Sequence, residues 1–251
     1  MEEILTLKKT YSQVDEVKDM LEVEYDLEIK PLNNFPSKLV KHLVERFTLK
    51  GKLLDVMCGR GEHSQAFDEA GLEVWCVDIS KDAGETFGKR DERLRTADVM
   101  LDLFPYEDES FDVVWCKSGI EHVNGDHIMS EARRVLKPGG KVIILTPDWY
   151  YNYRIHYIDH THGYGTPWMK QSLRNIFMSY GFENIVSENF LYLSHTWRKG
   201  PIGFISRLGC RLIRLFPYPY IDNFTGFLWK IMRFSNEVQL LGFATKKNVK
   251  N

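Results

Sequence analysis

The stretch Lys52–His63, K-L-L-D-V-M-C-G-R-G-E-H, is the part of this sequence from which a fold can be argued most directly. Its largely apolar run over Leu53–Met57 is short and lies between glycines, which predicts a strand buried on both faces. Gly59 and Gly61 allow the backbone to turn tightly and to approach a ligand closely, and a helix is expected over residues 62–70. A strand, a glycine-containing turn and a helix N-terminus in succession form a corner that can bind a nucleotide-sized ligand.

Composition places the chain among globular proteins with a sizeable core, since 43% of its 251 residues are hydrophobic and 13% are aromatic. The net charge of -2 gives no reason to expect nucleic-acid binding. The four cysteines show no metal-ligand spacing and are interpreted as reduced, small hydrophobic residues: Cys58, Cys76, Cys116 and Cys210. The acidic start M-E-E-I-L does not resemble a signal peptide, and no apolar run is long enough to span a bilayer, so cytoplasmic residence is expected.

Two parts of the chain differ in pattern. Residues 1–50 are expected to form a helical extension, because apolar residues recur at helical spacing on either side of Pro31 and Pro36. Residues 51–251 are expected to form the main domain. In it, short apolar runs predict strands near residues 53–56, 72–78, 94–97, 111–116, 141–146, 181–190 and 237–246.

Predicted helices alternate with most of these strands, at residues 62–70, 81–90, 126–136 and 169–180, with Asp126 as the expected cap of the third. This alternation predicts an α/β fold with a doubly wound, parallel sheet. Ligands of such sheets bind beyond the carboxyl ends of the strands. Five candidate ligand-binding residues fall there: Asp55, Gly59, Asp78, Asp98 and Lys117.

The signs of the charges at these strand ends separate the candidate cofactors. Asp78 lies where a carboxylate can accept hydrogen bonds from both hydroxyls of a ribose, which suits NAD and S-adenosylmethionine equally. A pyrophosphate would have to sit among Asp55, Glu62 and Asp98, and like charges oppose this. S-adenosylmethionine carries an ammonium, a sulfonium and an adenine amino group instead of phosphates, so the acidic rim favours it.

Five motifs together resemble the class I S-adenosylmethionine-dependent methyltransferases that act on small molecules, lipids and sugars. They lie between residues 53 and 147 and read L-D-V-M-C-G-R-G, V-D-I-S, F-P-Y-E-D-E-S-F-D-V-V, G-I-E-H-V and R-V-L-K-P-G-G-K-V-I-I-L-T-P. The resemblance implies a Rossmann-like, seven-stranded sheet that is mostly parallel, with an antiparallel last strand and helices on both faces. One departure is Met57, which stands where the family usually has glycine.

The resemblance also implies roles for individual residues. The methionine portion of the cofactor would be held by Asp55, Gly59 and Gly61. The ribose would lie against Asp78 and Ile79, and the adenine against Asp98 and Val99. Lys117 and Ser118 would line the pocket at the end of the fourth strand.

Methyl transfer to a hydroxyl needs alignment and removal of a proton, for which a histidine is suited. His122, in G-I-E-H-V, is one candidate base, and its alternative role is a structural Glu–His pair that shapes the loop. The second candidate is His162 with Asp159, which match an Asp-x-x-His element of related sugar- and lipid-modifying methyltransferases.

Metal binding is not expected. Three histidines near the second candidate base (His156, His160 and His162) make a zinc site conceivable, but no cysteine or second cluster completes it. Some quinone-pathway O-methyltransferases bind a divalent metal through a Glu-x-x-Glu-His element. This chain has Ser118 at the position of the first glutamate, which argues against that metal site.

A basic, aromatic insertion is predicted at about residues 194–235, in which Arg207, Arg211 and Arg214 recur at helical spacing and apolar residues share the other side. It fits a lid helix packed on the acceptor pocket with its arginines in water, or a membrane-surface helix with peripheral contact over residues 204–234. The first-choice acceptor is a sugar or glycan precursor, followed by a lipid-linked or quinone-type acceptor. Outside this class, an NAD(P)-dependent oxidoreductase and a non-catalytic cofactor-binding protein stay open.

Overall fold

The computed structural model describes residues 34–152, 166–215, 232 and 234–248 of the chain. These residues form a seven-stranded sheet with the strand order β3-β2-β1-β4-β5-β7-β6. The strands are β1 (Lys52–Val56), β2 (Glu73–Asp78), β3 (Leu94–Thr96), β4 (Phe111–Lys117), β5 (Leu136–Pro147), β6 (Phe182–Leu191) and β7 (Val238–Lys246).

Most neighbouring strands run in parallel. β1 pairs in parallel with β2 on one side and with β4 on the other, with Asp55 opposite Cys76 and Trp115. β7 alone runs antiparallel to its two neighbours, β5 and β6. The predicted seven-stranded, mostly parallel sheet with an antiparallel last strand is therefore confirmed, and its order reverses direction between β1 and β4, where ligands of such sheets bind.

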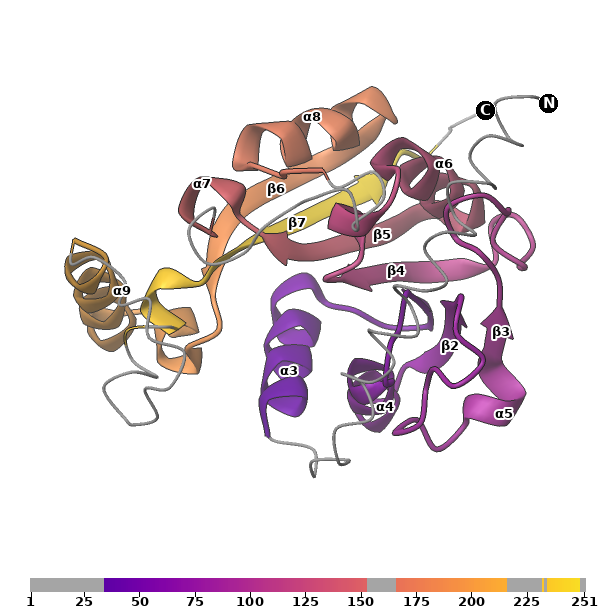
Figure 1. Cartoon of the computed structure of the whole chain (residues 1–251), viewed down its shortest axis with the longest axis horizontal. Coiled ribbons are helices and arrows are strands. Elements are labelled where there is room, and N and C mark those ends of the chain that lie inside the picture. The colour runs from indigo at the N-terminus through magenta and orange to yellow at the C-terminus, as the bar shows by residue number, and fades with distance from the viewer. Residues whose placement is uncertain (1–33, 153–165, 216–231, 233, 249–251) are drawn as a thin grey trace, which may run out of the picture.

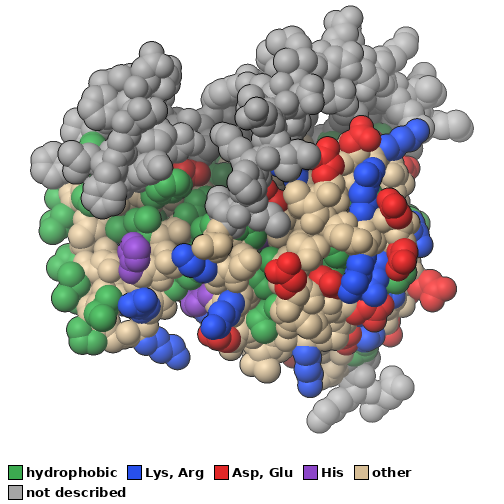
Figure 2. All heavy atoms as spheres, turned by 90° about the horizontal axis from the view of Figure 1, so that it is seen from below, with side chains coloured by type: hydrophobic (Ala, Val, Ile, Leu, Met, Phe, Trp, Pro, Cys, Tyr) green, Lys and Arg blue, Asp and Glu red, His purple; other side chains and the backbone are tan. Residues whose placement is uncertain are grey.

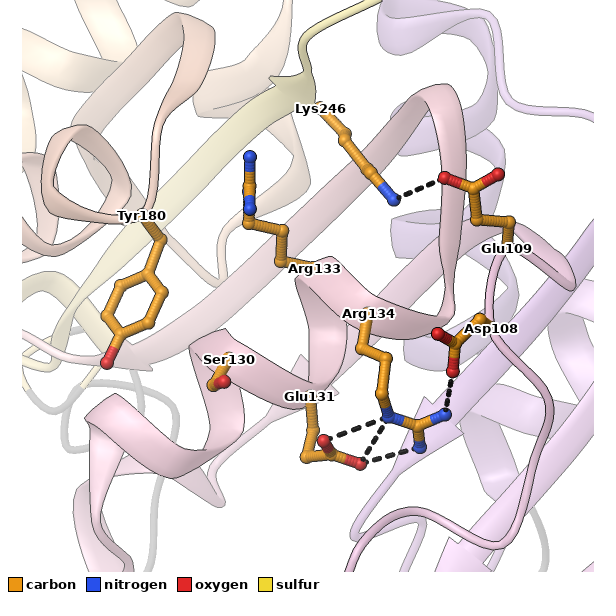
Figure 3. Close-up of a pocket in the computed structure, with 8 residues that line it drawn as sticks. All are labelled: Asp108, Glu109, Ser130, Glu131, Arg133, Arg134, Tyr180 and Lys246. Carbon is orange, nitrogen blue, oxygen red and sulfur yellow. Dashed lines mark hydrogen bonds and ion pairs between the residues drawn. The ribbon is translucent and has the colours of Figure 1, made fainter. Parts of the chain in front are cut away.

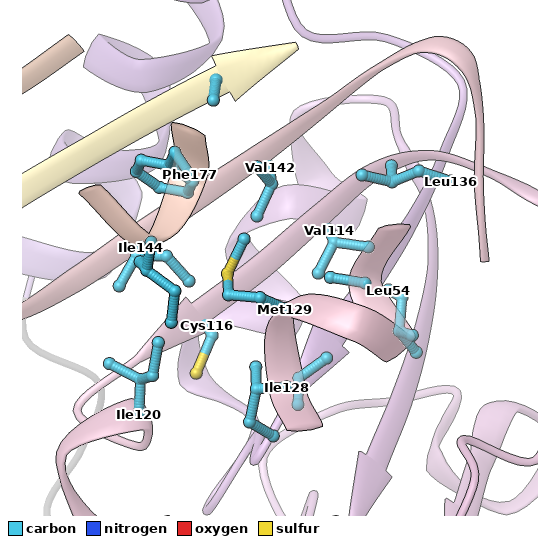
Figure 4. Packing of buried hydrophobic residues seen from close by; sticks show 14 of the residues in the cluster. Leu54, Val114, Cys116, Ile120, Ile128, Met129, Leu136, Val142, Ile144 and Phe177 are labelled. Atoms are coloured by element: carbon cyan, nitrogen blue, oxygen red, sulfur yellow. The ribbon is translucent and has the colours of Figure 1, made fainter. Parts of the chain in front are cut away.

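Helices cover both faces of the sheet, as Figure 1 shows. One face carries α3 (Phe35–Phe47) and α4 (Glu62–Glu69), and the other carries α6 (Gly125–Val135) and α8 (Lys170–Ser179). Each face has its own apolar cluster. Under α6 and α8, the side chains of Ile128, Met129 and Phe177 lie over those of Val114 and other sheet residues (Figure 4).

The helix α3 is part of the domain core, although the sequence pattern suggested an extension that ends at residue 50. Leu39, Val40 and Leu43 are fully buried in one cluster with Leu53 of β1 and Phe67 of α4. The first predicted helical segment of the extension, within residues 1–33, lies outside the described residues.

Two local expectations were wrong. Residues 81–88 do not form a helix, because their backbone amides bond the glycine turn instead: Gly84 N–H donates to Gly59 O over 2.7 Å and Thr86 N–H to Arg60 O over 2.9 Å. A short helix, α5 (Arg90–Arg93), follows. The cap of α6 is Asn124 rather than Asp126, since the Asn124 side chain accepts the Asp126 N–H.

The remaining short elements lie at the carboxyl ends of the strands or beyond them. They are the 3₁₀ helix η1 (Ile120–His122), the helix α7 (Trp149–Asn152), the 3₁₀ helix η3 (Ser194–Trp197) and the helix α9 (Pro201–Ile213). The last two belong to the predicted insertion. No helix in the described part of the chain is long and apolar enough to cross a bilayer.

Candidate functional site

The carboxylate of Asp78 ends β2 and joins the turn after β1. Its Oδ2 accepts the backbone N–H of Gly59 and its Oδ1 that of Ser80, both over 3.0 Å. The residue is only 8% exposed, and burial raises the pKa of its carboxyl, while hydrogen bonds from these two amides oppose that shift. The group is thus fixed by two backbone donors at the edge where β1 and β2 end.

Asp55 lies deeper and joins β1 to α4. It is 2% exposed, and its Oδ2 accepts a 2.6 Å hydrogen bond from Ser64 Oγ, which in turn lies 3.3 Å from Cys76 Sγ. Burial, with a smaller contribution from Asp78, raises the pKa of Asp55 to about 7, although the Ser64 bond opposes it. The Asp55 side chain is thus buried, and its hydrogen bond to Ser64 holds the first turn of α4 against β1.

The two glycines of the turn differ in what surrounds them. Both have positive φ, 52° at Gly59 and 80° at Gly61. A Cβ added at Gly59 would meet nothing within 4 Å, whereas one at Gly61 would lie 3.0 Å from Gly84 Cα and from Phe87 Cβ. Gly59 therefore leaves space in front of the backbone, and Gly61 lets the turn pack against residues 84–87.

Met57 occupies the first position of the turn with a glycine-like backbone. Its φ is 59°, a conformation that side chains with a Cβ adopt at a cost. Its amide donates to Val77 O over 2.8 Å, and its sulfur lies where a Cβ on Gly119 would approach within 2.8 Å. Met57 therefore has the left-handed backbone conformation that favours the glycine usual in the family.

The expected adenine side follows β2 and β3. Asp98 lies in the turn after β3 and its Oδ1 accepts the N–H of Met100, while Val99 is buried in the core. Ile79, beside Asp78, is 40% exposed and offers an apolar surface there. Asp78, Ile79 and Asp98 thus all follow the ends of the neighbouring strands β2 and β3, as the sequence predicted.

The end of β4 carries the partly buried lysine Lys117. Burial lowers the pKa of Lys117, and the nearby carboxylates of Glu121 and Glu62 act in the opposite direction. Its Nζ lies 3.3 Å from Ser118 Oγ and 5.9 Å from the ring centre of Tyr192. Burial, together with the charges of Glu237 and Glu121, raises the pKa of the Tyr192 phenol, which is therefore a neutral donor. Sequence analysis missed Tyr192, because a single tyrosine after a strand belongs to no motif.

His63, at the start of α4, is a second residue for which the sequence predicted no role. Among the described residues its Nε2 is buried and has no hydrogen-bond partner. Burial, with a smaller contribution from Lys117, lowers the pKa of the imidazole to about 3, so the ring is neutral. Its ring centre lies 5.9 Å from that of Trp115 on β4.

The candidate bases are only partly described. His122 ends η1, directly after the β4 end, and its backbone N–H donates to Gly119 O. The neighbouring Glu121 is buried, with Oε2 accepting Thr146 Oγ1 over 2.9 Å, so it ties η1 to β5. Asp159 and His162 lie outside the described residues, as do His156 and His160.

A pocket of about 720 Å³ lies at the opposite ends of the strands (Figure 3). Most of its charged groups are paired within the protein: Arg134 bonds Glu131 and Asp108 over 2.7 Å each, and Lys246 bonds Glu109 over 3.1 Å. Because these residues flank the starts of β4 and β5, the pocket is separate from the edge formed by Asp78 and Lys117.

Known proteins with a similar sequence or fold indicate the family to which this site corresponds. Residues 54–144 match the family model described as "Methyltransferase domain". The match over these residues agrees with the predicted class I S-adenosylmethionine-dependent methyltransferase. It also agrees with S-adenosyl-L-methionine, the cofactor that the acidic rim predicted.

Relatives of the methyltransferase domain cover only part of the chain. "Ubiquinone/menaquinone biosynthesis C-methyltransferase UbiE" of Burkholderia mallei (strain SAVP1) is 35% identical over 103 residues, 38% of this chain. The protein of the same name from Burkholderia thailandensis matches with the same identity and coverage. The chain spans about two fifths, 42%, of the length of these curated relatives.

Solved structures agree on the fold over a larger part of the chain. An S-adenosylmethionine-dependent methyltransferase from Archaeoglobus fulgidus has a TM-score of 0.54 at 20% identity, covering 84% of this chain and 94% of that one. Phosphoethanolamine N-methyltransferase 2 of Haemonchus contortus, solved with S-adenosyl-L-methionine, has a TM-score of 0.53 at 20% identity, covering 83% and 52%. At these identities the likeness concerns the fold.

The chemistry at the edge fits the cofactor. The space in front of Gly59 admits a ligand close to the backbone, and the carboxylate of Asp78 stands beside it with unbonded lone pairs for hydroxyl donors. The exposed Ile79 side chain can lie against a flat ring. No group of three or more metal-ligating side chains lies together in the described part of the chain.

Proposed function

We propose that the protein transfers a methyl group from S-adenosyl-L-methionine to a small-molecule acceptor. The observation that carries this proposal is the fixed carboxylate of Asp78 beside the open face of Gly59, at the reversal of strand order in a methyltransferase domain. When bound, the cofactor supplies an electrophilic methyl group on a sulfonium. The residues of the chain hold it, exclude water and align the acceptor.

In this proposal the cofactor runs along the carboxyl ends of β1, β2 and β3. Asp78 accepts the ribose hydroxyls, with Ile79 beside it. Asp98 takes the adenine amino group. Gly59 passes under the methionine portion, and Asp55 acts through Ser64 by holding α4 in place.

The acceptor would bind beyond β4, where Lys117, Ser118 and Tyr192 meet. Lys117 and the neutral Tyr192 hydroxyl can both donate hydrogen bonds to an acceptor oxygen. For a hydroxyl acceptor, His162 oriented by Asp159 is the proposed base, and His122 is the second candidate. The aligned histidine, rather than a metal ion, would remove the proton of the hydroxyl.

The proposed acceptor is a sugar or glycan precursor, by the Asp159 and His162 resemblance. A lipid-linked or quinone-type acceptor is the second candidate. It is favoured by the exposed apolar side chains of α9, which lies beside η3 after the end of β6, and by the name of the Burkholderia relatives.

The test is transfer of a labelled methyl group from S-adenosyl-L-methionine to a panel of sugar nucleotides, lipid-linked sugars and hydroquinones. The proposal expects turnover on one acceptor class. His162→Ala or His122→Ala should lower that turnover by about 10²–10⁴ with cofactor affinity unchanged, if the acceptor is a hydroxyl. His42→Ala is the control, because His42 lies on α3 with its ring stacked on that of Trp197 at 5.1 Å and belongs to neither candidate element. Cofactor binding without turnover on any class would favour a non-catalytic protein.

A further inference from the structure

Two of the three arginines of the helix α9, Arg207 and Arg214, donate hydrogen bonds to backbone carbonyls of the protein. Gly203 and Cys210 are buried, and a Cβ on Gly203 would collide with Arg198 O. On the same side, Arg207 Nη1 donates to Thr196 O over 2.6 Å, and Arg214 Nη1 donates to Ser235 O over 3.1 Å. The spacing of these residues, four, three and four, defines one face of a helix, and that face is the inner one.

The opposite face of α9 is apolar and exposed. Four residues at spacings of three, four and three make up this outer stripe: Ile205, Leu208, Leu212 and Leu215, the last just past the helix end. Their exposed fractions are 65%, 45%, 53% and 78%. Ile202 and Phe204 flank the stripe and are exposed as well. The expected lid has its apolar side packed on the acceptor pocket, whereas in the structure that side is exposed; Arg207 and Arg211 are exposed as expected.

Positive charge surrounds this outer stripe. The segment Ser194–Leu215 contains five Lys and Arg residues and no Asp or Glu, so it carries +5 and leaves -7 for the rest of a chain of net charge -2. Arg198 and Lys199 precede the helix and are exposed, and Arg211 is exposed beside the stripe. Figure 2 shows hydrophobic side chains gathered at the α9 end of the molecule, with Lys and Arg side chains next to them.

We propose that α9 binds the surface of an anionic lipid bilayer. The helix would lie in the membrane plane, with the outer stripe at the acyl boundary and Arg198, Lys199 and Arg211 at the head groups. Its 13 residues extend about 20 Å, which suits lying on a bilayer and is too short to span one. The positive charge favours an anionic membrane over a symmetric dimer in which α9 packs on α9, because two α9 segments would repel each other.

Vesicle co-sedimentation tests this proposal without methyl transfer, so it stands apart from the proposed function. The full chain should sediment with vesicles of phosphatidylcholine and phosphatidylglycerol, should not with phosphatidylcholine alone, and should release as salt is raised. The double variant Leu208→Ser, Leu212→Ser should lower binding at least about tenfold. Met178→Ser, at a 56% exposed residue of α8, is the matched control and should leave binding unchanged.

The contribution of the positive charge is tested with the double variant Arg198→Gln, Lys199→Gln. It should lower binding to anionic vesicles about fivefold for each charge removed. Lys41→Gln, at an exposed lysine of α3, is its control. Affinity for S-adenosylhomocysteine should be unchanged in all variants, which shows that they fold. The proposal is overturned if the full chain does not sediment at low salt, if Met178→Ser acts as strongly as the double variant, or if the double variant abolishes only a dimer.

Discussion

The backbone amide of Gly59 donates a 3.0 Å hydrogen bond to Oδ2 of Asp78, which ties the turn after β1 to the end of β2. The amide fixes the carboxylate, and the absence of a side chain on Gly59 leaves space beside it. The second glycine of the turn, Gly61, has no such space. The cofactor site and the packing of the turn therefore depend on different glycines.

Alanine at each glycine should separate these two requirements. Gly59→Ala should cost about 1–2 kcal/mol of stability, because its φ is 52°, and should weaken S-adenosylhomocysteine binding, since the new Cβ enters the ligand space. Gly61→Ala should cost about 1–3 kcal/mol beyond the same φ penalty, because its Cβ meets Gly84 and Phe87. Urea denaturation and calorimetry measure both. Equal losses of stability in the two variants would show that the turn is packed alike at both positions.

The stabilities of two variants at position 57 should show whether its backbone is left-handed. Met57→Gly and Met57→Ala both remove the side chain, but alanine retains a Cβ at a φ of 59°. We expect Met57→Gly to be the more stable of the two by about 1 kcal/mol. At Met178, inside α8, the order should reverse, with alanine better by about 1 kcal/mol. Greater stability of Met57→Ala would mean that the position is not left-handed.

The buried carboxyl of Asp55 should make stability depend on pH. Its pKa is raised to about 7 in the folded protein, so between about pH 4 and pH 7 the native state binds more protons than the unfolded state. The free energy of unfolding should therefore fall as pH rises through this window. Asp55→Asn, which can still accept the Ser64 hydrogen bond, should remove about 1–4 kcal/mol of that fall. Parallel profiles of variant and parent, followed by urea denaturation, would show that Asp55 is already ionised at pH 4.

The corner and the sheet could be predicted because their signals are local. Apolar runs bounded by glycines fix strands, and alternation with helices fixes a doubly wound sheet. The failure at residues 81–88 had a non-local cause: Gly84 and Thr86 bond the glycine turn, a contact that helix periodicity does not contain.

The site beyond the cofactor corner was harder to predict. Tyr192 reaches Lys117 only because β6 and β4 end at the same edge, and their sequence separation hides this. For α9, periodicity identified the apolar stripe but not that this stripe is exposed. Gly203 and Cys210 carried that signal, since small residues at helical spacing allow close packing of a helix.

Calorimetric titration with S-adenosylhomocysteine and NAD, in the parent and in Asp78→Ala, tests the central claim most directly. The account predicts that the parent binds S-adenosylhomocysteine and not NAD. Asp78→Ala should weaken that binding by about 1.5–3 kcal/mol, the scale of lost hydrogen bonds to a charged group. Asp82→Ala, at an exposed carboxylate four residues further on, should bind like the parent. Unchanged affinity in a folded Asp78→Ala protein, or tighter binding of NAD by the parent, would contradict the account.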